Sequence, residues 1–280
     1  MLKMKSTVFD IQRASFVDGD GVRTAVFFKG CSLRCKWCHN PEGIKREKEL
    51  LYYQSRCTSC GKCNEVCKRA EGNCTLCGKC ALYCPSDAKE LCGRDYTVDE
   101  LFEIIKRDKT FYEKTGGGVT FTGGECMLQI DFLVQMLKLC RENGINTAVD
   151  TAGNVPFGSF ELALPYADTF LYDIKCINEE LHISGTGHTN KLILDNFNRL
   201  LSLGASVTVR IPVIGGFNDT DEEMEAICTF LKGKKISGVE LLPYHNLGAH
   251  KYEALGTEMS KYYVPTDEKM EKYRKIFKEI

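Results

Sequence analysis

Short apolar runs recur along most of the chain, and segments in which apolar residues return at helical spacing lie between them. The apolar runs predict buried strands at residues 22–30, 119–125, 146–150, 169–175, 206–214 and 239–244. Helical spacing predicts helices at 97–105, 130–143, 188–203 and 221–232, and a charged helix from residue 267 onward. A shorter strand-like run at 7–12 precedes all of these.

Strands that are mostly followed by helices predict a parallel sheet with right-handed crossovers. Six such units are too few for a closed eight-stranded barrel, so we expect an open, partial (β/α)6 TIM-like barrel. A flat doubly wound sheet is the alternative. Local signals mark the helix boundaries: Thr97 and Glu100 have the spacing of a capping box, and Gly144 can end the helix before it.

One segment breaks this α/β rhythm. Residues 46–94 are rich in cysteine and follow the first strand where a helix is due, so we expect a barrel of residues 1–45 and 95–280 with 46–94 inserted. The insertion contains two runs of equal spacing, Cys57-x2-Cys60-x2-Cys63-x3-Cys67 and Cys74-x2-Cys77-x2-Cys80-x3-Cys84-Pro85. This is the spacing of bacterial two-cluster ferredoxins.

In such ferredoxins the fourth cysteine of each run binds the cluster of the other run. We therefore expect a ferredoxin-like insertion with two 4Fe–4S clusters, one held by Cys57, Cys60, Cys63 and Cys84 and the other by Cys67, Cys74, Cys77 and Cys80. Cys92 is an alternative ligand. Two zinc sites are the alternative to the clusters.

A third cysteine group, Cys31-x3-Cys35-x2-Cys38, follows the first strand of the predicted barrel. Loops after parallel strands are where α/β barrels carry their chemistry. Three thiolates can hold three irons of a 4Fe–4S cluster and leave the fourth iron open to a substrate. The alternatives are a zinc knuckle and buried free cysteines. The other cysteines stand singly in ordinary elements, so we expect free thiols at Cys92, Cys126, Cys140, Cys176 and Cys228.

Composition narrows the classes of function. The chain has 280 residues, of which 43% are hydrophobic, and can bury a core of medium size. A net charge of −1 gives no electrostatic reason to expect nucleic acid or an anionic membrane as a partner. No apolar run reaches the length of a transmembrane helix, and residues 1–16 are too polar for a signal peptide. Sixteen cysteines in such a chain predict reduced metal ligands in a cytoplasmic protein, from an organism that lives without oxygen.

Polar residues stand at the ends of the predicted strands. Gly123-Gly124-Glu125 combines close backbone approach with a carboxylate, which suits an ammonium group. Other strand ends carry Asp150-Thr151, Asp173-Ile174-Lys175, Arg210 and His245. Because the carboxyl ends of parallel strands share one rim, we expect these residues to converge on one ligand beside the three cysteines of the first loop.

The Cys31 group, with Trp37 just before its last cysteine, resembles the radical S-adenosylmethionine (radical SAM) enzymes. Nearly the whole chain is similar to the glycyl radical enzyme activating enzymes, a family that includes the activating enzyme of pyruvate formate-lyase (formate C-acetyltransferase). The resemblance rests on Asp18-Gly-x-Gly-x-Arg23, Trp37-Cys-His-Asn-Pro-Glu42, Thr122-Gly-Gly-Glu125, Asp150-Thr151, Asp173-Ile-Lys175, His182-x3-Thr186-Gly187, Arg210 and Leu242-Pro-Tyr-His245. The insertion resembles the branch that activates dehydratases, decarboxylases and lyases. Asp20 departs from the family, which usually has proline there.

The resemblance implies reductive cleavage of SAM to a 5′-deoxyadenosyl radical, which takes hydrogen from a glycine of a partner glycyl radical enzyme. It implies a catalytic cluster on Cys31, Cys35 and Cys38, reduced by flavodoxin or ferredoxin. The implied SAM contacts are Trp37, Cys38, His39, Gly123, Gly124, Glu125, Asp150, Asp173, Ile174, Lys175, Arg210 and His245. Relatives hold a monovalent cation at the positions of Asp150, Thr151, Tyr172 and Asp173, and Asp18 is implied to meet the partner's loop.

Within this set, Gly124 and Glu125 are implied to meet the methionine amino group and Lys175 its carboxylate. For the insertion we expect an electron relay to the catalytic cluster, with a docking scaffold as the alternative. Two other classes of function stay open. One is a radical SAM enzyme that acts on a small molecule or peptide with the help of its auxiliary clusters. The other is a non-catalytic iron–sulfur electron carrier with a barrel appended.

Overall fold

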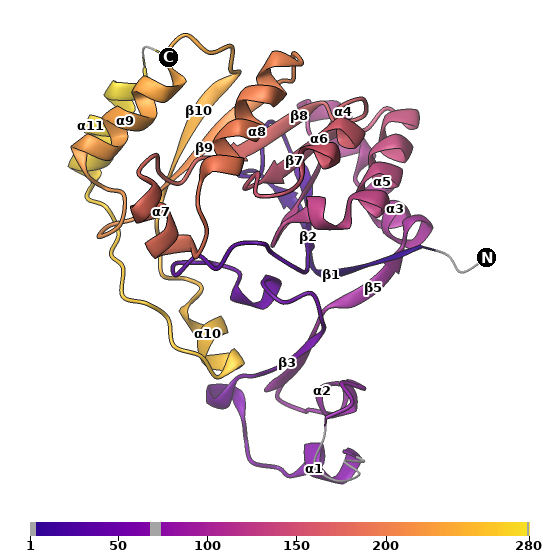
Figure 1. Ribbon diagram of the computed structural model, residues 1–280. Helices are drawn as coiled ribbons and strands as arrows, with labels where there is room; N and C mark the ends of the chain where they lie inside the picture. The colour runs from indigo at the N-terminus through magenta and orange to yellow at the C-terminus, as the bar shows by residue number, and fades with distance from the viewer. Residues whose placement is uncertain (1–3, 68–73, 279) are drawn as a thin grey trace.

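The computed structural model describes residues 4–67, 74–278 and 280. Its main feature is an eight-stranded sheet in which six neighbouring strands are parallel (Figure 1). In spatial order these are β2 (Arg23–Phe28), β6 (Gly118–Gly123), β7 (Asn146–Thr151), β8 (Thr169–Asp173), β9 (Val207–Val213) and β10 (Gly238–Pro243). Two antiparallel strands, β1 (Lys5–Ser15) and β5 (Arg94–Thr97), extend the sheet beyond β2. The predicted parallel sheet is confirmed.

The parallel strands follow one another in space in the same order as in the sequence. A doubly wound sheet reverses its strand order at a switch point, so that alternative is wrong for this chain. An unreversed order of six strands is the order of a TIM-like barrel that stays open. Every parallel strand therefore ends at the same rim.

Helices connect the strands from β5 to β10, and two further helices, α10 (Ala249–Leu255) and α11 (Asp267–Phe277), follow β10 (Figure 1). The connecting helices are α3 (Val98–Lys106), α4 (Lys109–Thr115), α5 (Ile130–Glu142), α6 (Phe157–Ala163), α7 (Glu179–Thr186), α8 (Lys191–Ser202) and α9 (Asp221–Leu231). The predicted capping box at Thr97 and Glu100 is confirmed, since each residue's side chain accepts the other's backbone N–H. In the core between helices and sheet, Phe28 packs against Phe121 and Phe132, with ring centroids 6.1 Å apart in both pairs.

None of the helices in the described ranges is both long and apolar enough to cross a membrane.

The helix predicted at 188–203 starts later than expected, and a separate helix precedes it. α7 ends at Thr186 because Gly187 takes a left-handed conformation with φ +80°. α8 begins at Lys191, after Asn190, whose buried side chain donates to backbone carbonyls of the preceding segment. Residue 188 therefore lies in the link between two helices.

The turn between β1 and β2 is held by its own arginine. Arg23 is 2% exposed and donates to the hydroxyl of Thr120 and to the carbonyl of Asp20. Gly21 has φ +68°, and a Cβ there would lie 2.5 Å from the backbone nitrogen of Gly117. The arginine and this glycine therefore fix the turn beside β6.

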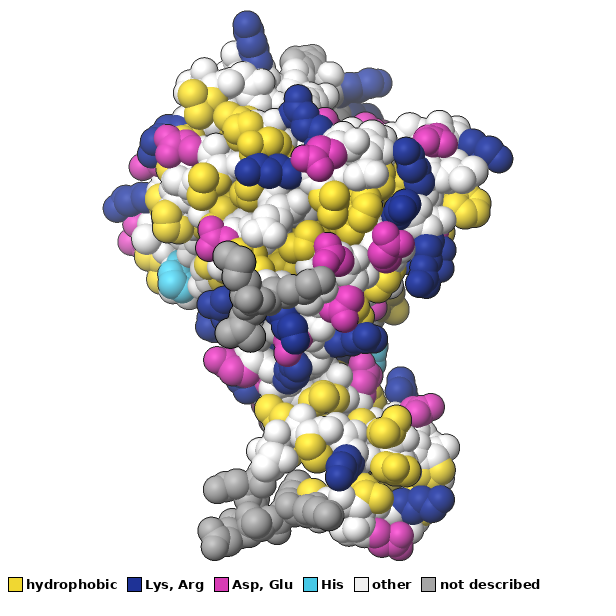
Figure 2. Space-filling model, turned by 90° about the vertical axis from the view of Figure 1, so that its right-hand side faces the viewer, with side chains coloured by type: hydrophobic (Ala, Val, Ile, Leu, Met, Phe, Trp, Pro, Cys, Tyr) yellow, Lys and Arg dark blue, Asp and Glu magenta, His cyan; other side chains and the backbone are white. Residues whose placement is uncertain are grey.

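The cysteine-rich segment leaves the sheet after β2 and returns at β5. Its two strands, β3 (Glu49–Tyr52) and β4 (Lys89–Cys92), pair antiparallel, and two short helices, α1 (Lys62–Val66) and α2 (Lys79–Leu82), lie between them in the sequence. Figures 1 and 2 show this part as a lobe joined to the barrel through a narrower waist. Residues 68–73 of the expected insertion lie outside the described residues.

Candidate functional site

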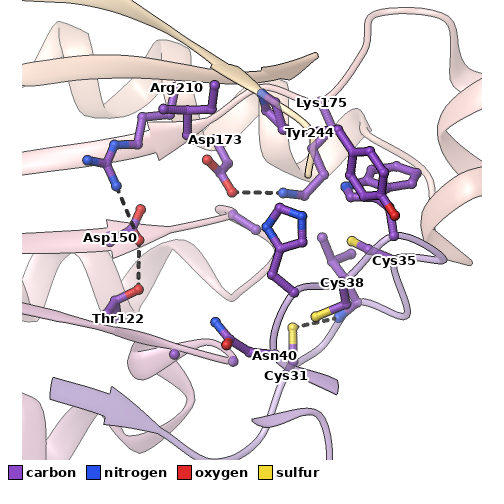
Figure 3. Close-up of a pocket in the computed structure, with 18 of the residues that line it drawn as sticks. Cys31, Cys35, Cys38, Asn40, Thr122, Asp150, Asp173, Lys175, Arg210 and Tyr244 are labelled. Carbon is purple, nitrogen blue, oxygen red and sulfur yellow. Dashed lines mark hydrogen bonds and ion pairs between the residues drawn. The ribbon is translucent and has the colours of Figure 1, made fainter. Parts of the chain in front are cut away.

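A loop of three cysteines leaves β2 at the rim of the sheet. Gly30 has φ +100° and donates its N–H to the carbonyl of Gly43 at 2.8 Å, which closes the loop at its base. Cys31, Cys35 and Cys38 all line one cavity of about 510 Å³. Figure 3 shows their sulfur atoms gathered on one side of the loop. The structure therefore brings the three predicted cluster ligands together.

The C-terminal end of α7 supports the middle of this cysteine loop. The N–H of Arg34 donates to the carbonyl of Thr186 at 2.8 Å, and the N–H of Lys36 donates to the carbonyl of Gly185 at 3.0 Å. A Cβ at Gly185 would lie 2.4 Å from the ring of Phe217, so glycine permits this close approach. The motif around Thr186 thus serves here to hold the loop.

Burial controls the protonation of the three thiols. It raises the pKa of Cys31 and of Cys38 to about 12, and it also raises the pKa of Cys35. Metal ligation requires the thiolate, so a bound group has to supply positive charge to favour that form. Ser32 Oγ and His39 Nε2, on the same loop, are buried without a hydrogen-bond partner among the described residues. Soft thiolate donors and unpaired polar atoms around a roomy cavity fit an iron–sulfur cluster with a further ligand beside it.

The spacing of the thiols also bears on the zinc alternative. Over residues 4–67, 74–278 and 280, no group of three or more His, Cys, Asp or Glu side chains lies close enough to hold a single metal ion. Sulfur ligands lie about 2.3 Å from a zinc ion and therefore about 3.8 Å from each other. The cysteines of a 4Fe–4S cluster lie further apart, because each one binds a different iron.

The carboxyl ends of five parallel strands, β6 to β10, line the same cavity. Because the strand order does not reverse, residues far apart in the sequence meet there. Of the predicted ligand contacts, those that line it are Trp37, Cys38, His39, Gly123, Gly124, Asp150, Asp173, Lys175, Arg210 and His245.

Polar and charged side chains at the ends of neighbouring strands form two separate groups of contacts in the cavity (Figure 3). Lys175 Nζ donates to Asp173 Oδ2 at 2.7 Å, and Thr122 donates its hydroxyl to Asp150 at 2.7 Å. Arg210 lies 3.7 Å from the same Asp150 carboxylate. Burial lowers the pKa of Lys175, but the Asp173 carboxylate and the thiols of Cys35 and Cys31 together outweigh burial, so the net shift of this pKa is upward. Burial raises the pKa of Asp150 to about 6 although Arg210 opposes the shift. The cavity therefore offers a cation and carboxylates at fixed positions.

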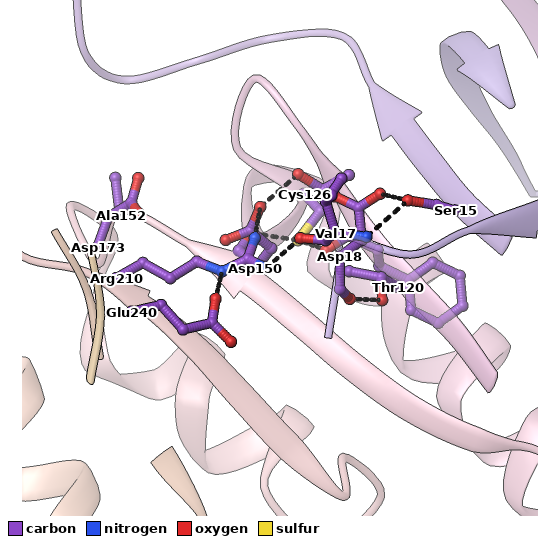
Figure 4. A network of polar contacts seen from close by, with 12 residues as sticks. Ser15, Val17, Asp18, Thr120, Cys126, Asp150, Ala152, Asp173, Arg210 and Glu240 are labelled. Atoms are coloured by element: carbon purple, nitrogen blue, oxygen red, sulfur yellow. Dashed lines mark hydrogen bonds and ion pairs between the residues drawn. The ribbon is translucent and has the colours of Figure 1, made fainter. Parts of the chain in front are cut away.

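The turn before β2 lines the cavity and is held by a network of polar contacts (Figure 4). Arg210 donates to the carbonyl of Val17 at 2.7 Å, and Thr120 donates its hydroxyl to the carbonyl of Asp18 at 2.6 Å. The Asp18 carboxylate accepts from the hydroxyl of Ser15. Val17 and Asp18 both line the cavity, so the predicted partner-loop residue stands at its mouth.

Aromatic side chains form another part of the cavity wall. The rings of His39 and His245 stack with centroids 3.9 Å apart at 12°, and Tyr244 continues the stack at 5.4 Å from His39. Burial, with the neighbouring His245, lowers the pKa of His39 to about 4, so this ring is neutral near pH 7. Trp37 is 4% exposed and packs on Phe217 with ring centroids 4.2 Å apart. Stacked rings suit a planar aromatic ligand, while most of the Trp37 ring belongs to the core.

Three predicted residues are not among those that line this cavity in the part of the chain that the structure describes. Glu125 is 1% exposed, and its carboxylate accepts from the hydroxyl of Thr151 at 2.9 Å. Ile174 is buried in the main core, and Tyr172 donates its hydroxyl to the carbonyl of Ile193 at 2.7 Å. Their side chains therefore lie behind the rim, and their roles as ligand contacts stay predictions.

A second cavity, of about 250 Å³, lies in the insertion. Its cysteines are Cys57, Cys60, Cys63 and Cys84, so the fourth one comes from the other run, as in two-cluster ferredoxins. Backbone N–H groups point at the sulfurs here: Ala88 donates to Cys84 at 3.2 Å. The backbone N–H of Ser86, together with weaker donors, lowers the pKa of Cys84 to about 7. The lowered pKa favours the thiolate, which is the form that binds a metal.

The two cysteine runs of the insertion share one backbone conformation. Ser59 and Leu76, each just before the second cysteine of its run, have φ of +55° and +52°. Gly61 and Gly78, each just after that cysteine, have φ of +77° and +73°, and a short helix follows in both runs. Left-handed residues turn successive N–H groups inward and build the concave nests that occur at many iron–sulfur sites.

The remaining predicted cluster is interrupted by residues 68–73, which lie outside the described residues. Its cysteines, Cys67, Cys74, Cys77 and Cys80, are free thiols like the rest of the sixteen, and their grouping stays a prediction. Cys92 is 3% exposed and lies 3.9 Å from the Nζ of buried Lys29. It lines neither of the two cavities described above, and its role as an alternative ligand stays a prediction.

Sequence reasoning missed residues that support the cysteine loop. Tyr252 donates its hydroxyl to the carbonyl of Cys38 at 2.9 Å, and Lys251 donates to Asn40 at 2.8 Å. Both lie on α10, whose seven residues are too few to show a clear helical period. The position of α10 just after His245 was the one available signal.

A family model, two curated proteins and a solved structure are each similar to this chain. The model of the radical SAM superfamily matches residues 25–231. The trans-4-hydroxy-L-proline dehydratase activating enzyme of Clostridioides difficile is 41% identical over 98% of this chain and 96% of its own length. The choline trimethylamine-lyase activating enzyme of Oleidesulfovibrio alaskensis is 41% identical over 92% of this chain and 89% of its own. A solved domain of a pyruvate-formate lyase-activating enzyme from Bacteroides vulgatus, 28% identical, matches 58% of this chain and 94% of its own with a TM-score of 0.51.

The buried carboxyl of Glu125 predicts a pH dependence of stability. Burial raises its pKa from 4.5 to about 7. The folded chain therefore binds this proton more tightly than the unfolded chain does, so the group's contribution to the free energy of unfolding falls as pH rises from about 4.5 through about 7. Between pH 5 and pH 8 the wild type should therefore lose on the order of 2 kcal/mol of its free energy of unfolding through this group, and Glu125→Gln should not show this loss. Urea unfolding of the metal-free chain at the two pH values measures the difference.

Glu142→Gln, an exposed change on α5, is the matched control and should leave the pH dependence as it is in the wild type. If the Glu125→Gln chain and the wild type lose stability in parallel over this range, Glu125 does not carry a raised pKa.

Proposed function

Since this chain belongs to the radical SAM superfamily and, within it, to the activating enzymes of glycyl radical enzymes, we propose that it cleaves SAM reductively and that the 5′-deoxyadenosyl radical takes hydrogen from a glycine of a partner enzyme. The observation that carries this proposal is the single cavity in which Cys31, Cys35 and Cys38 face the charged rim of the sheet. A non-catalytic electron carrier does not bind a substrate and therefore does not need a cavity of this kind beside its cysteines.

We propose that the partner is a glycyl radical enzyme of the dehydratase or lyase type. The relatives reported above are named activating enzymes of a dehydratase and of a lyase, and each is similar to almost the whole chain. This assignment replaces the expectation of an activating enzyme like that of formate C-acetyltransferase, because these relatives are named for other partner enzymes.

In this proposal Cys31, Cys35 and Cys38 hold the catalytic 4Fe–4S cluster. When bound, the cluster supplies the electron for cleavage and an open iron for the methionine part of SAM. The chain itself positions the reactants and limits the access of water. Its backbone contacts from α7 keep the three thiols at one side of the cavity.

The rim provides contacts for each part of SAM. The Lys175 ammonium is nearly buried and suits the methionine carboxylate, and the backbone of Gly123 and Gly124 allows close approach of the amino group. The stack of His39 and His245 suits the adenine ring. Contacts from Asp173, Ile174 and Arg210 remain part of the proposal.

We also propose a monovalent cation at Asp150, Thr151, Tyr172 and Asp173. Asp150 and Asp173 stand close enough that the second carboxylate raises the pKa of the first. A bound cation would relieve that repulsion. The ring of Tyr172 lies in the core, so this residue can contribute only its backbone carbonyl, opposite Thr151 on the neighbouring strand.

For residues 46–94 we propose a ferredoxin-like domain with two auxiliary clusters. The cavity lined by Cys57, Cys60, Cys63 and Cys84 supports the first cluster, and the shared backbone of the two cysteine runs supports an equivalent second one. A relay of electrons from flavodoxin or ferredoxin to the catalytic cluster is the role we propose for them.

The proposed reaction predicts a protein radical. Mixing the reconstituted chain with SAM, a reductant and a co-encoded glycyl radical enzyme should give a persistent glycyl radical, measured by electron paramagnetic resonance. Asp18→Asn should lower the radical yield about tenfold, because Asp18 stands at the cavity mouth, while cleavage of SAM without a partner stays near the wild-type rate.

Asp20→Asn, an exposed change in the same turn, is the matched control and should leave the yield unchanged. Turnover of a free small molecule with no radical on any partner protein would falsify the proposed function.

The cluster assignment predicts the metal content. The anaerobically reconstituted chain should hold about twelve iron atoms and a similar amount of sulfide, and Cys84→Ala should remove about four of the irons, because Cys84 shares a cavity with three other predicted ligands. Cys92→Ala is the control, since Cys92 lines neither cavity, and should keep all of them. Zinc in the insertion, with iron only at the Cys31 group, contradicts the assignment.

The relay predicts a dependence on the electron donor. Replacement of Cys60 and Cys77 by alanine should slow activation of the partner at least several-fold when flavodoxin or ferredoxin is the donor, because each cleavage consumes one electron that enters through the insertion. The rate of glycyl radical formation measures this, with Cys92→Ala as the control. Activation at the wild-type rate with either protein donor shows that the insertion is a scaffold instead.

A further inference from the structure

α10 touches two parts of the protein that are distant from it in the sequence. It follows β10 and His245, and in Figure 1 it lies between the cysteine loop and the lobe of the insertion. It packs against β3 of the insertion and against the short 3-10 helix Pro41–Gly43 that closes the cysteine loop. Its position is therefore that of a bridge between the two proposed iron–sulfur sites.

On the insertion side, α10 shares a small hydrophobic core with the ribbon β3–β4. Ala254 and Leu51 are 5% and 2% exposed and belong to the same cluster of apolar side chains. The ring of His250 stacks on that of Tyr53 with centroids 6.2 Å apart. Tyr53 in turn donates its N–H to the carbonyl of Ala88, which lines the cavity of the insertion. Movement of the ribbon therefore reaches α10 through packed side chains.

On the barrel side, α10 holds the last part of the cysteine loop by polar contacts. Tyr252 is 8% exposed and donates its hydroxyl to the carbonyl of Cys38 at 2.9 Å. Lys251 donates to the side chain of Asn40 at 2.8 Å and pairs with the buried carboxylate of Glu42 at 2.5 Å. Two consecutive residues of one helix therefore fix three positions of the loop.

Tyr252 is not among the residues that line the large cavity in the described chain, so its hydroxyl serves the backbone and does not face a ligand. The carbonyl it binds belongs to a residue whose N–H already donates within the loop, to Cys35 at 3.2 Å. The backbone N–H of Cys38 is thus held from within the loop and its carbonyl from outside it, so Tyr252 helps to set the orientation of Cys38. Partners that orient a metal ligand in this way also tune the metal it binds.

We propose that α10 is the mechanical link between the insertion and the cysteine loop, and that Tyr252 is the positioning residue through which the packing of the ribbon sets the position of Cys38. This inference rests on the proposed function in one respect, namely that Cys38 binds a cluster.

The first test uses the metal-free chain and does not depend on activity. Tyr252→Phe removes the hydroxyl and keeps the ring, so amide hydrogen exchange of residues 35–42 should become about fivefold faster. Tyr273→Phe is the matched control, because the hydroxyl of Tyr273 is buried on α11 without a hydrogen-bond partner among the described residues. It should leave exchange in the loop unchanged. Equal exchange in the two variants overturns the role of Tyr252.

The second test uses the reconstituted protein. The catalytic cluster is identified as the paramagnetic signal that changes when SAM is added, and its midpoint potential is measured by titration. Tyr252→Phe should make this potential more negative, since a hydrogen-bond donor near a ligand residue is lost, while Tyr273→Phe should match the wild type. If the wild type gives no signal that responds to SAM, the proposed function fails. If the wild type responds and Tyr252→Phe has the wild-type potential, this inference fails alone.

The link to the insertion is tested by His250→Ala, which removes the ring that stacks on Tyr53. If α10 transmits the packing of the ribbon, exchange of residues 35–42 should also become faster in this variant of the metal-free chain. Faster exchange confined to residues 49–53, with the cysteine loop unchanged, overturns the link.

Discussion

The loss of water around three thiols is the constraint on which the rest of this structure depends. Cys31, Cys35 and Cys38 lie where burial holds them in the protonated form, whereas metal binding needs the thiolates. Because the loop has to present three thiolates to a metal, burial of apolar side chains alone cannot keep it in place. Instead its backbone is bound from several sides: by Gly43 at its base, by the end of α7 in its middle and by α10 at its end. Lys29, fully buried just before the loop, adds a contact from its ammonium group to the carbonyl of Glu42 at 2.5 Å.

The sequence predicted the parts of the fold in which apolar periodicity is strong. Each of the six parallel strands contains apolar residues that mark it in the sequence, and the order of the strands places Asp150, Asp173 and Arg210 at one rim, as in any parallel sheet. α7 was missed because its buried residues are His182, Gly185 and Thr186, which carry no apolar period. β3 and β4 have four residues each, too few for a pattern, and exist through their pairing with each other. The contacts of α7 and α10 with the cysteine loop could not be predicted either, because they join residues that are distant in the sequence and meet only in the folded chain.

Cysteine spacing was the more informative signal within the insertion. Equal spacing in the two runs led to equal backbone conformations, with left-handed residues at Ser59 and Leu76 in corresponding places. The predicted exchange of the fourth cysteine agrees with the cavity that Cys84 shares with three residues of the first run. Spacing could not predict the surroundings of Cys92, because Lys29 lies just after β2, more than sixty residues earlier, and contacts Cys92 only in the folded chain.

The place of the insertion also matters for how the chain folds. It lies between β2 and β6 in the sequence, and these two strands pair side by side, so their pairing has to bridge the whole cysteine-rich segment. The entropy of closing such a loop grows with the logarithm of its length, so doubling the loop costs only about 0.6 kcal/mol. Pairing of β1 with both β2 and β5 brings the two ends of the insertion to one side of the sheet and shortens the gap further. The length of this segment therefore costs the pairing of β2 with β6 little in loop-closure entropy, so the sheet tolerates a long insertion at this place.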